Sequence, residues 1–185
     1  MAGLNRALFE NRILAKANES VGKSCIFLSH ISIDKSWATA IGEYITRYGD
    51  IDIYLDVNDP DLQSAVLTND AALMTRFIER GLSRSTHIMC LVSVDTVRSW
   101  WVPYELGFAK NAGRHLSTLK LKGDVELPAY LEISEIIRGT KSLNQYLTAI
   151  RSGLTKASAN AALTKSLIEH YVATHPLDTY LNFNA

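Results

Sequence analysis

The sequence predicts an α/β fold with a central parallel sheet of about five strands and helices on both faces. Two observations lead to this prediction. Apolar runs that are too short to be buried helices recur along the chain, and segments with apolar residues at helical spacing separate them. Because strands and helices alternate in this order, we expect the strands to pair in parallel and the connecting helices to pack on the two faces.

The composition is typical of a single globular domain. The chain has 185 residues, 47% of them hydrophobic and 21% charged, and its 19 Lys and Arg residues balance its 19 Asp and Glu residues. This neutrality gives no broad attraction for nucleic acid or anionic lipid, so we expect no nucleic acid and no membrane as a partner. No apolar run approaches the roughly 18–20 residues that span a bilayer, and the N-terminus lacks an apolar secretory core. The expected location is the cytoplasm.

The first elements follow from short local patterns. Residues 4–17 place apolar side chains at helical spacing among charged ones, which predicts a modest amphipathic helix. The apolar run 24–29 starts abruptly and ends in polar residues, as a central strand does. A helix follows from Asp34, a candidate N-cap, and stops at Gly49 and Asp50.

The middle of the chain continues the alternation. Residues 51–55 predict the second strand, and the density of Asp, Asn and Pro over residues 56–61 predicts a loop. Residues 71–82 place their large apolar side chains on one helical face. The run 87–93 is the clearest buried strand of the sequence.

The last third repeats this pattern. Residues 102–112 predict a helix and residues 115–121 an extended segment, while residues 128–133 predict a short fifth strand. Helices are predicted around 143–154 and, in an Ala-rich stretch, over 157–173.

These elements divide the chain into a main domain with an appendage at each end. We expect residues 1–22 to form an N-terminal helical extension and residues 23–155 to form the domain itself. Residues 156–185 are expected to form a C-terminal helix and tail that pack on the domain.

Candidate site residues follow from the parallel sheet. Ligands bind beyond the carboxyl ends of parallel strands, and this rule selects the loops 29–34, 56–61 and 93–101. Polar side chains gather in these loops. The candidates are Ser29, His30, Asp34, Asp56 and Ser93. For His30, a functional role and a simple loop hydrogen bond are equally credible.

The start of the helix after the third loop is unusual because it carries two adjacent tryptophans and a proline. Trp101 and Glu105 are four residues apart and therefore share one helical face. A carboxylate beside an indole in a cleft would be desolvated, which raises its pKa. Glu105 can equally be a solvated acid favoured by the helix dipole, and spacing alone prefers this simpler interpretation.

Other site templates are missing from the sequence. It has no Gly-x-Gly-x-x-Gly after the first strand, no phosphate-binding P-loop and no Gly-x-Ser-x-Gly elbow. The five histidines include no His-x-x-x-His pair, and Cys25 and Cys90 lie inside apolar runs as buried thiols do. We therefore expect no metal site.

Three blocks together resemble the TIR (Toll/interleukin-1 receptor) family, including its bacterial NAD-consuming members. The first block is the strand end 27–30, which Asp34 follows in the sequence, and the second is the strand end 54–56. The third consists of residues 91–93 followed by Ser-Trp-Trp-Val-Pro-Tyr-Glu at 99–105. The last block matches the family pattern of Trp-x-x-x-Glu on the helix after a strand and a short loop. The resemblance covers roughly residues 24–150 and implies a flavodoxin-like, three-layer TIR fold.

In catalytic TIR domains, the Glu of Trp-x-x-x-Glu is needed to cleave the nicotinamide–ribose bond of NAD. The resemblance therefore implies that Glu105 is catalytic, with NAD+ as substrate and no bound cofactor. It also implies products that are ADP-ribose or a cyclic isomer, as in Thoeris anti-phage defence, with self-association and a separate effector as partners. The residues to which it assigns substrate contact are Ser29, His30, Asp34, Asp56, Ser93 and Trp101.

Two alternatives remain open at the level of sequence. The chain can be a non-catalytic TIR scaffold that binds other TIR domains, because many adaptor domains share this fold. It can also be an enzyme similar to nucleoside deoxyribosyltransferases, which place a Glu at a ribose.

Overall fold

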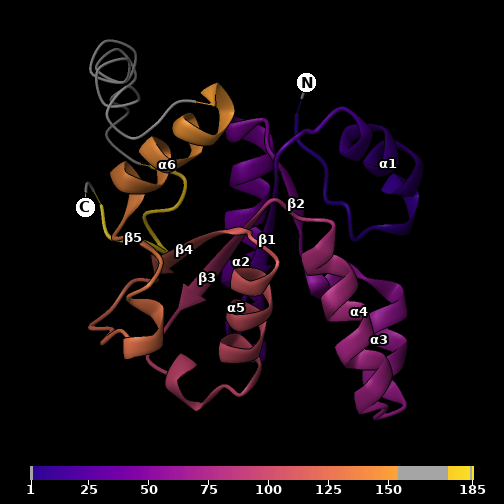
Figure 1. Cartoon of the computed structure of the whole chain (residues 1–185). Coiled ribbons are helices and arrows are strands. Elements are labelled where there is room, and N and C mark those ends of the chain that lie inside the picture. Colours follow the sequence, from indigo (N-terminus) through magenta and orange to yellow (C-terminus); the bar gives the residue numbers. More distant parts are fainter. Residues whose placement is uncertain (1, 154–174, 184) are drawn as a thin grey trace.

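Strands β1 to β5 form one all-parallel sheet in the computed structural model, which describes residues 2–153, 175–183 and 185 (Figure 1). The order across the sheet is β2-β1-β3-β4-β5, which is the order of flavodoxin-like folds. The predicted fold class, a flavodoxin-like parallel sheet with helices on both faces, is confirmed. The strands are β1 (Cys25–Ser29), β2 (Asp52–Tyr54), β3 (His87–Val92), β4 (His115–Lys120) and β5 (Glu135–Ile137).

Helices connect the strands and follow the last one. Within the described residues, the α-helices are α1 (Arg12–Ser20), α2 (Lys35–Tyr44), α3 (Pro60–Leu67), α4 (Ala71–Ser83), α5 (Trp101–Asn111) and α6 (Thr140–Ser152). Helix α2 continues into a π-helical turn, Ile45–Gly49, and ends at Asp50, whose left-handed backbone (φ 53°) reverses the chain. The helix predicted at 157–173 lies outside the described residues.

Two hydrophobic layers enclose the sheet because side chains alternate along its strands. In β1, Ile26 and Leu28 face the layer that α2 and α6 cover, whereas Phe27 faces the layer that α4 and α5 cover. Strand β3 alternates in the same way, with Met89 in the first layer and Cys90 in the second. All these side chains are buried, which explains why the central strands read as continuous apolar runs.

The segment predicted as a loop after β2 is shorter than predicted, because a helix begins before its end. The chain makes a 3₁₀ turn at Asp56–Asn58 and enters α3 at Pro60. The Asp59 carboxylate accepts hydrogen bonds from the backbone N–H of Asp61 at 3.0 Å and of Leu62 at 3.5 Å. An N-capping Asp followed by Pro at the first helical position is a helix start signal, so the predicted loop ends at Asp59 and not at Asp61.

The fifth strand also lies elsewhere than predicted. Residues 128–133 contain a 3₁₀ turn, Ala129–Leu131, in which the Leu131 N–H donates to the Pro128 carbonyl at 2.9 Å. Strand β5 follows only at Glu135, where the chain pairs with β4. Proline has no N–H to donate to a strand neighbour, and this favours the turn.

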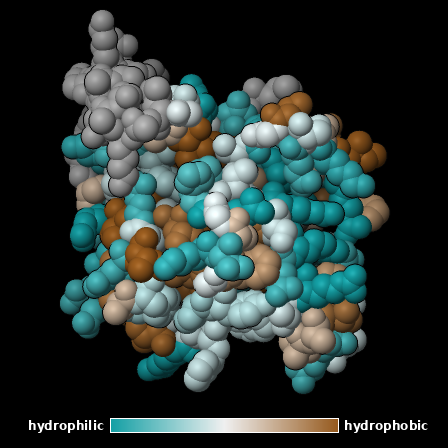
Figure 2. Space-filling model, viewed as in Figure 1, coloured by the Kyte–Doolittle hydropathy of each residue, from teal (hydrophilic) through white to brown (hydrophobic). Residues whose placement is uncertain are grey.

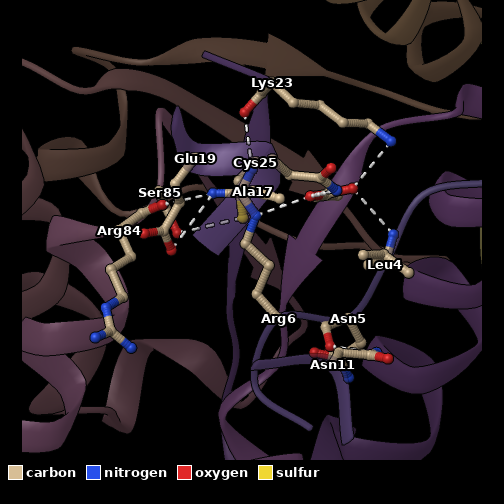
Figure 3. A network of polar contacts seen from close by, with 12 residues as sticks. Leu4, Asn5, Arg6, Asn11, Ala17, Glu19, Lys23, Cys25, Arg84 and Ser85 are labelled. Carbon is tan, nitrogen blue, oxygen red and sulfur yellow. Dashed lines mark hydrogen bonds and ion pairs between the residues drawn. The ribbon is translucent and has the colours of Figure 1, made fainter. Parts of the chain in front are cut away.

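The predicted N-terminal helix begins later than residue 4 because the first residues bind the edge of the sheet. The backbone of Leu4 accepts from Ile53 N–H and Arg6 N–H donates to the Ile53 carbonyl, both at 2.8 Å. Arg6 then donates through Nε to the fully buried Asp52 carboxylate at 2.8 Å (Figure 3). This segment therefore covers the β2 edge, which would otherwise leave unpaired backbone groups exposed.

The described part of the C-terminal tail packs against the same domain. Leu177 and Leu181 are buried in the layer that α2 and α6 cover. The backbone carbonyls of Tyr180 and Asn182 accept hydrogen bonds from Lys122 and Thr140. Within the described residues, none of the helices has the length and apolarity required to cross a membrane.

Candidate active site

The candidate site lies where β1 and β3 end, under the first turns of α5. Ser29 is the last residue of β1, and Cys90 is its register partner on β3. Strand alternation turns the Ser29 side chain toward the layer of α5. Glu105, one turn into α5, meets it there.

A buried hydrogen bond joins Ser29 to Glu105. The Ser29 hydroxyl donates to Oε2 of Glu105 at 2.5 Å, and only 3% of Glu105 is exposed. The interpretation of Glu105 as a solvated acid was therefore wrong. Burial and, to a smaller extent, the negative charge of Asp56 raise the pKa of Glu105 to about 8, although the Ser29 hydrogen bond opposes the rise. A pKa above neutral favours the protonated form of the Glu105 carboxyl at neutral pH in this arrangement.

Asp56 and His30 line the same edge of the sheet. The β1–β2 register pairs Phe27 with Tyr54, so Asp56 comes level with the end of β1. Nδ1 of the buried His30 ring lies 3.1 Å from the Leu28 carbonyl and 3.6 Å from Oδ1 of Asp56. Burial raises the pKa of Asp56, while a positive charge on His30 lowers it. His30 thus makes the loop hydrogen bond and also stands beside the second acid of the site.

Asp34 is buried and occupies the N-cap position of α2, as predicted. Its side chain makes no capping bond, because a 3₁₀ turn, Ser32–Asp34, precedes α2. Its Oδ2 has no hydrogen-bond partner among the described residues. Burial raises the pKa of Asp34, and the Ser93 side chain opposes this rise by hydrogen bonding. The predicted N-cap position of Asp34 is therefore confirmed, but its side chain does not cap the helix and instead lies near Ser93.

Trp101 lies at the rim of the site and does not bury the Glu105 carboxyl. Trp101 is 39% exposed, and its ring meets the Tyr104 ring edge-on with 5.8 Å between centroids. The neighbouring Trp100 is 91% exposed. The packing of α5 against the sheet therefore accounts for the burial of Glu105. The two tryptophans form an exposed aromatic rim.

Two residues near the site were not among the predicted site residues. Burial and the charge of Glu105 raise the pKa of the Cys90 thiol to about 12, although a hydrogen bond with Ser29 opposes the rise. The Tyr130 hydroxyl is buried without a hydrogen-bond partner among the described residues, and its pKa is raised by burial and by Cys90. Strand alternation opposite Ser29 could have indicated Cys90, but no local signal points to Tyr130.

This arrangement can bind a cation or a sugar hydroxyl when that ligand reaches the Glu105 carboxyl. Glu105 supplies an acid whose charge depends on its neighbours, and Ser29 supplies a hydroxyl that orients it. Because Glu105 is buried, a substrate can touch its carboxyl only after nearby side chains move. In the part of the chain that the structure describes, no group of three or more His, Cys, Asp or Glu side chains could hold a metal ion.

Comparisons with known proteins add little to this geometry. No family model matches the sequence, and no curated protein matches it. Among solved structures, the chain is similar to a diflavin flavoprotein A3 from Nostoc sp., at 13% identity and a TM-score of 0.37. That match covers 80% of this chain and 99% of the other. A likeness this distant carries no functional argument.

Proposed function

We propose that this protein is a TIR-type enzyme that cleaves the nicotinamide–ribose bond of NAD+, with Glu105 as the catalytic residue. The observation that carries the proposal is the buried hydrogen bond from Ser29 to Glu105 at the carboxyl end of the parallel sheet. Ionisable groups with strongly shifted pKa values concentrate at functional sites. In an open α/β sheet, this edge is also where ligands bind.

The chemistry of the bond suits a carboxyl of this kind. Nicotinamide leaves NAD+ as a neutral molecule, so no acid has to protonate it. The ribose becomes similar to an oxocarbenium ion in the transition state, and a fixed carboxylate stabilises that positive charge. A positive nicotinamide ring near Glu105 lowers the pKa of the carboxyl. Substrate binding would therefore release a proton at neutral pH and generate the carboxylate where the charge develops.

The other candidates take supporting roles in this proposal. Ser29 orients the Glu105 carboxyl, and Asp56 with His30 contacts the ribose and nicotinamide side. Asp34 and Ser93 bind ribose hydroxyls, and Trp101 packs against the substrate at the rim. Attack by water gives ADP-ribose, whereas internal attack by the adenine or a ribose hydroxyl gives a cyclic isomer. We propose that the product acts as a cytoplasmic signal for a separate effector in anti-phage defence, and that self-association completes the active site.

One observation favours the alternative of an interaction module. Trp100 is 91% exposed, and Val94 and Val97 beside it are 61% and 59% exposed. Such an apolar rim is typical of a surface that binds another protein. In that case Glu105 would be a structural acid.

The test compares NAD+ consumption by the wild type, Glu105→Gln and Glu43→Gln at high protein concentration and with a crowding agent. Gln keeps the shape of Glu105 and can still accept the Ser29 hydrogen bond, and Glu43 is an exposed acid on α2 that serves as the matched control. We expect nicotinamide release from the wild type and Glu43→Gln but a loss of at least about a hundredfold in Glu105→Gln. Chromatography of the co-product distinguishes hydrolysis from cyclisation. Equal activity in all three proteins, or none in the wild type, would refute the proposal and favour the interaction module, and a deoxynucleoside screen would test the transferase alternative.

A further inference from the structure

A cavity of about 220 Å³ lies between the N-terminal helix α1 and helix α4, on the β2 side of the molecule. Ala7, Ala15 and Tyr54 contribute to its wall. Figure 2 shows mostly hydrophilic residues over the region where α1 meets α4. The cavity is separate from Glu105, which does not line it.

The charged wall of this cavity is dominated by cations. Two carboxylates line it, from Glu19 and Asp59, against a larger set of basic side chains. The basic residues are Arg6, Arg12, Lys16, Arg80 and Arg84.

Three of these cations already have acidic partners. Arg6 pairs with Asp52 at 2.8 Å, and both Arg12 and Arg80 reach Asp61, at 3.0 and 2.9 Å. Arg80 also pairs with Asp59 at 2.9 Å. These pairs fix the guanidinium groups in the wall and join α1 to the start of α3.

The remaining basic side chains are available to a ligand. Lys16 and Arg84 are exposed, and neither forms an ion pair with the residues that the structure describes. The Arg84 guanidinium points away from the Arg6 network (Figure 3). In addition, Nε of Arg80 is buried and has no hydrogen-bond partner among the described residues. A buried N–H donor without an acceptor is costly, but this atom is closed to solvent, so an anion in the cavity can accept from it only after nearby side chains move.

We propose that this cavity binds a compact anion that carries phosphate, such as pyrophosphate or the diphosphate of a nucleotide. Phosphate oxygens match a guanidinium fork and can accept from the exposed cations Lys16 and Arg84, which line the same cavity. The cavity is smaller than the roughly 300–1,000 Å³ of sites for drug-sized ligands, so most of a larger ligand would remain outside. The bound anion joins α1 to α4 and stabilises the N-terminal segment on the domain.

The test is calorimetric titration of the full chain with sodium pyrophosphate, and separately with ADP, at constant ionic strength set with NaCl. We expect single-site binding by the wild type and an affinity at least about tenfold weaker in the Lys16→Ala, Arg84→Ala double variant. Arg76→Ala is the matched control, because Arg76 is an exposed cation on α4 that does not line the cavity. The control should bind as the wild type does. Thermal unfolding without ligand shows whether the variants remain folded.

The result also distinguishes two sources of the phosphate. Tighter binding of ADP than of pyrophosphate would identify a nucleotide as the ligand, and equal or weaker binding would identify the phosphate groups alone. The proposal is overturned if the wild type binds neither compound up to about 10 mM, a concentration at which a millimolar site would be mostly filled. It is also overturned if the folded double variant binds as tightly as the wild type. Neither outcome depends on NAD+ cleavage.

Discussion

Replacing Glu105 by Gln should stabilise the protein, and the gain should grow as the pH rises. Burial raises the pKa of Glu105 from an ordinary 4.5 to about 8, so the folded state resists its ionisation. Below pH 4.5 the carboxyl is protonated in both the folded and the unfolded chain, so its ionisation does not lower the free energy of unfolding. Between pH 4.5 and 8 the unfolded chain loses this proton while the folded chain keeps it, and the free energy of unfolding falls. Gln carries no charge in either state and avoids this loss.

The size of the effect follows from the shift. Each pKa unit corresponds to about 1.36 kcal/mol, so the difference between 4.5 and about 8 amounts to about 5 kcal/mol once the pH exceeds both values. At pH 7 the unfolded chain has passed its pKa by about 2.5 units, which corresponds to about 3 kcal/mol. A domain is stable by only about 5–15 kcal/mol, so the difference is readily measurable.

Urea unfolding of the wild type and Glu105→Gln at pH 5, 6, 7 and 8 measures this difference directly. Asp34, whose pKa burial also raises, is present in both proteins, so its contribution largely cancels. Glu43→Gln, on the exposed face of α2, should change stability little and equally at every pH. If the advantage of Glu105→Gln stays the same from pH 5 to 8, or if the variant is less stable than the wild type at pH 8, the buried carboxyl does not have the raised pKa on which this reasoning depends.

Three further predictions concern the surroundings of the site and the β2 edge. Asp56→Asn removes a negative charge that raises the pKa of Glu105, so the midpoint of Glu105 in a carbon NMR titration should move to lower pH. Arg6→Ala leaves a buried carboxylate without its guanidinium and should lower the free energy of unfolding by about 3–5 kcal/mol in urea. Gly81→Ala would place its Cβ 2.5 Å from Cε1 of the buried Tyr54 ring and should cost about 1–3 kcal/mol in the same assay.

Each of these predictions has an outcome that would contradict it, and two of them have a contrasting variant. An unchanged or higher Glu105 midpoint in Asp56→Asn would contradict the coupling of the two acids. Arg12→Ala removes a half-exposed ion pair and should cost at most about 1 kcal/mol, so a similar loss in both arginine variants would refute the special role of Arg6. Gly107→Ala adds a Cβ with nothing within 4 Å on an exposed helical surface and should stabilise slightly. Equal effects at Gly81 and Gly107 would show that the Tyr54 ring can move away from the added Cβ without a measurable loss of stability.

Local patterns in the sequence were sufficient for most of the sheet. The apolar runs 24–29 and 87–93 became β1 and β3, because a strand buried on both faces needs apolar side chains at every position. The helix predicted at 102–112 lies within one residue of α5. The alternation of these elements was enough to predict a parallel sheet, and hence the edge at which Glu105 lies. The resemblance to the TIR family remains a prediction.

Tertiary structure alone decided the features that depend on distant residues. The first residues bind β2 and not their own helix, because the open sheet edge offers backbone partners that local periodicity does not reveal. Ser29 and Glu105 are 76 positions apart, yet the fold joins them in one buried hydrogen bond. Spacing predicted that Glu105 lies on a helix, but its burial and raised pKa arise from the surrounding layer of α5 and from Asp56. Desolvation is a property of the packed surroundings. The sequence could therefore identify Glu105 as a candidate, but only the fold could determine its protonation state.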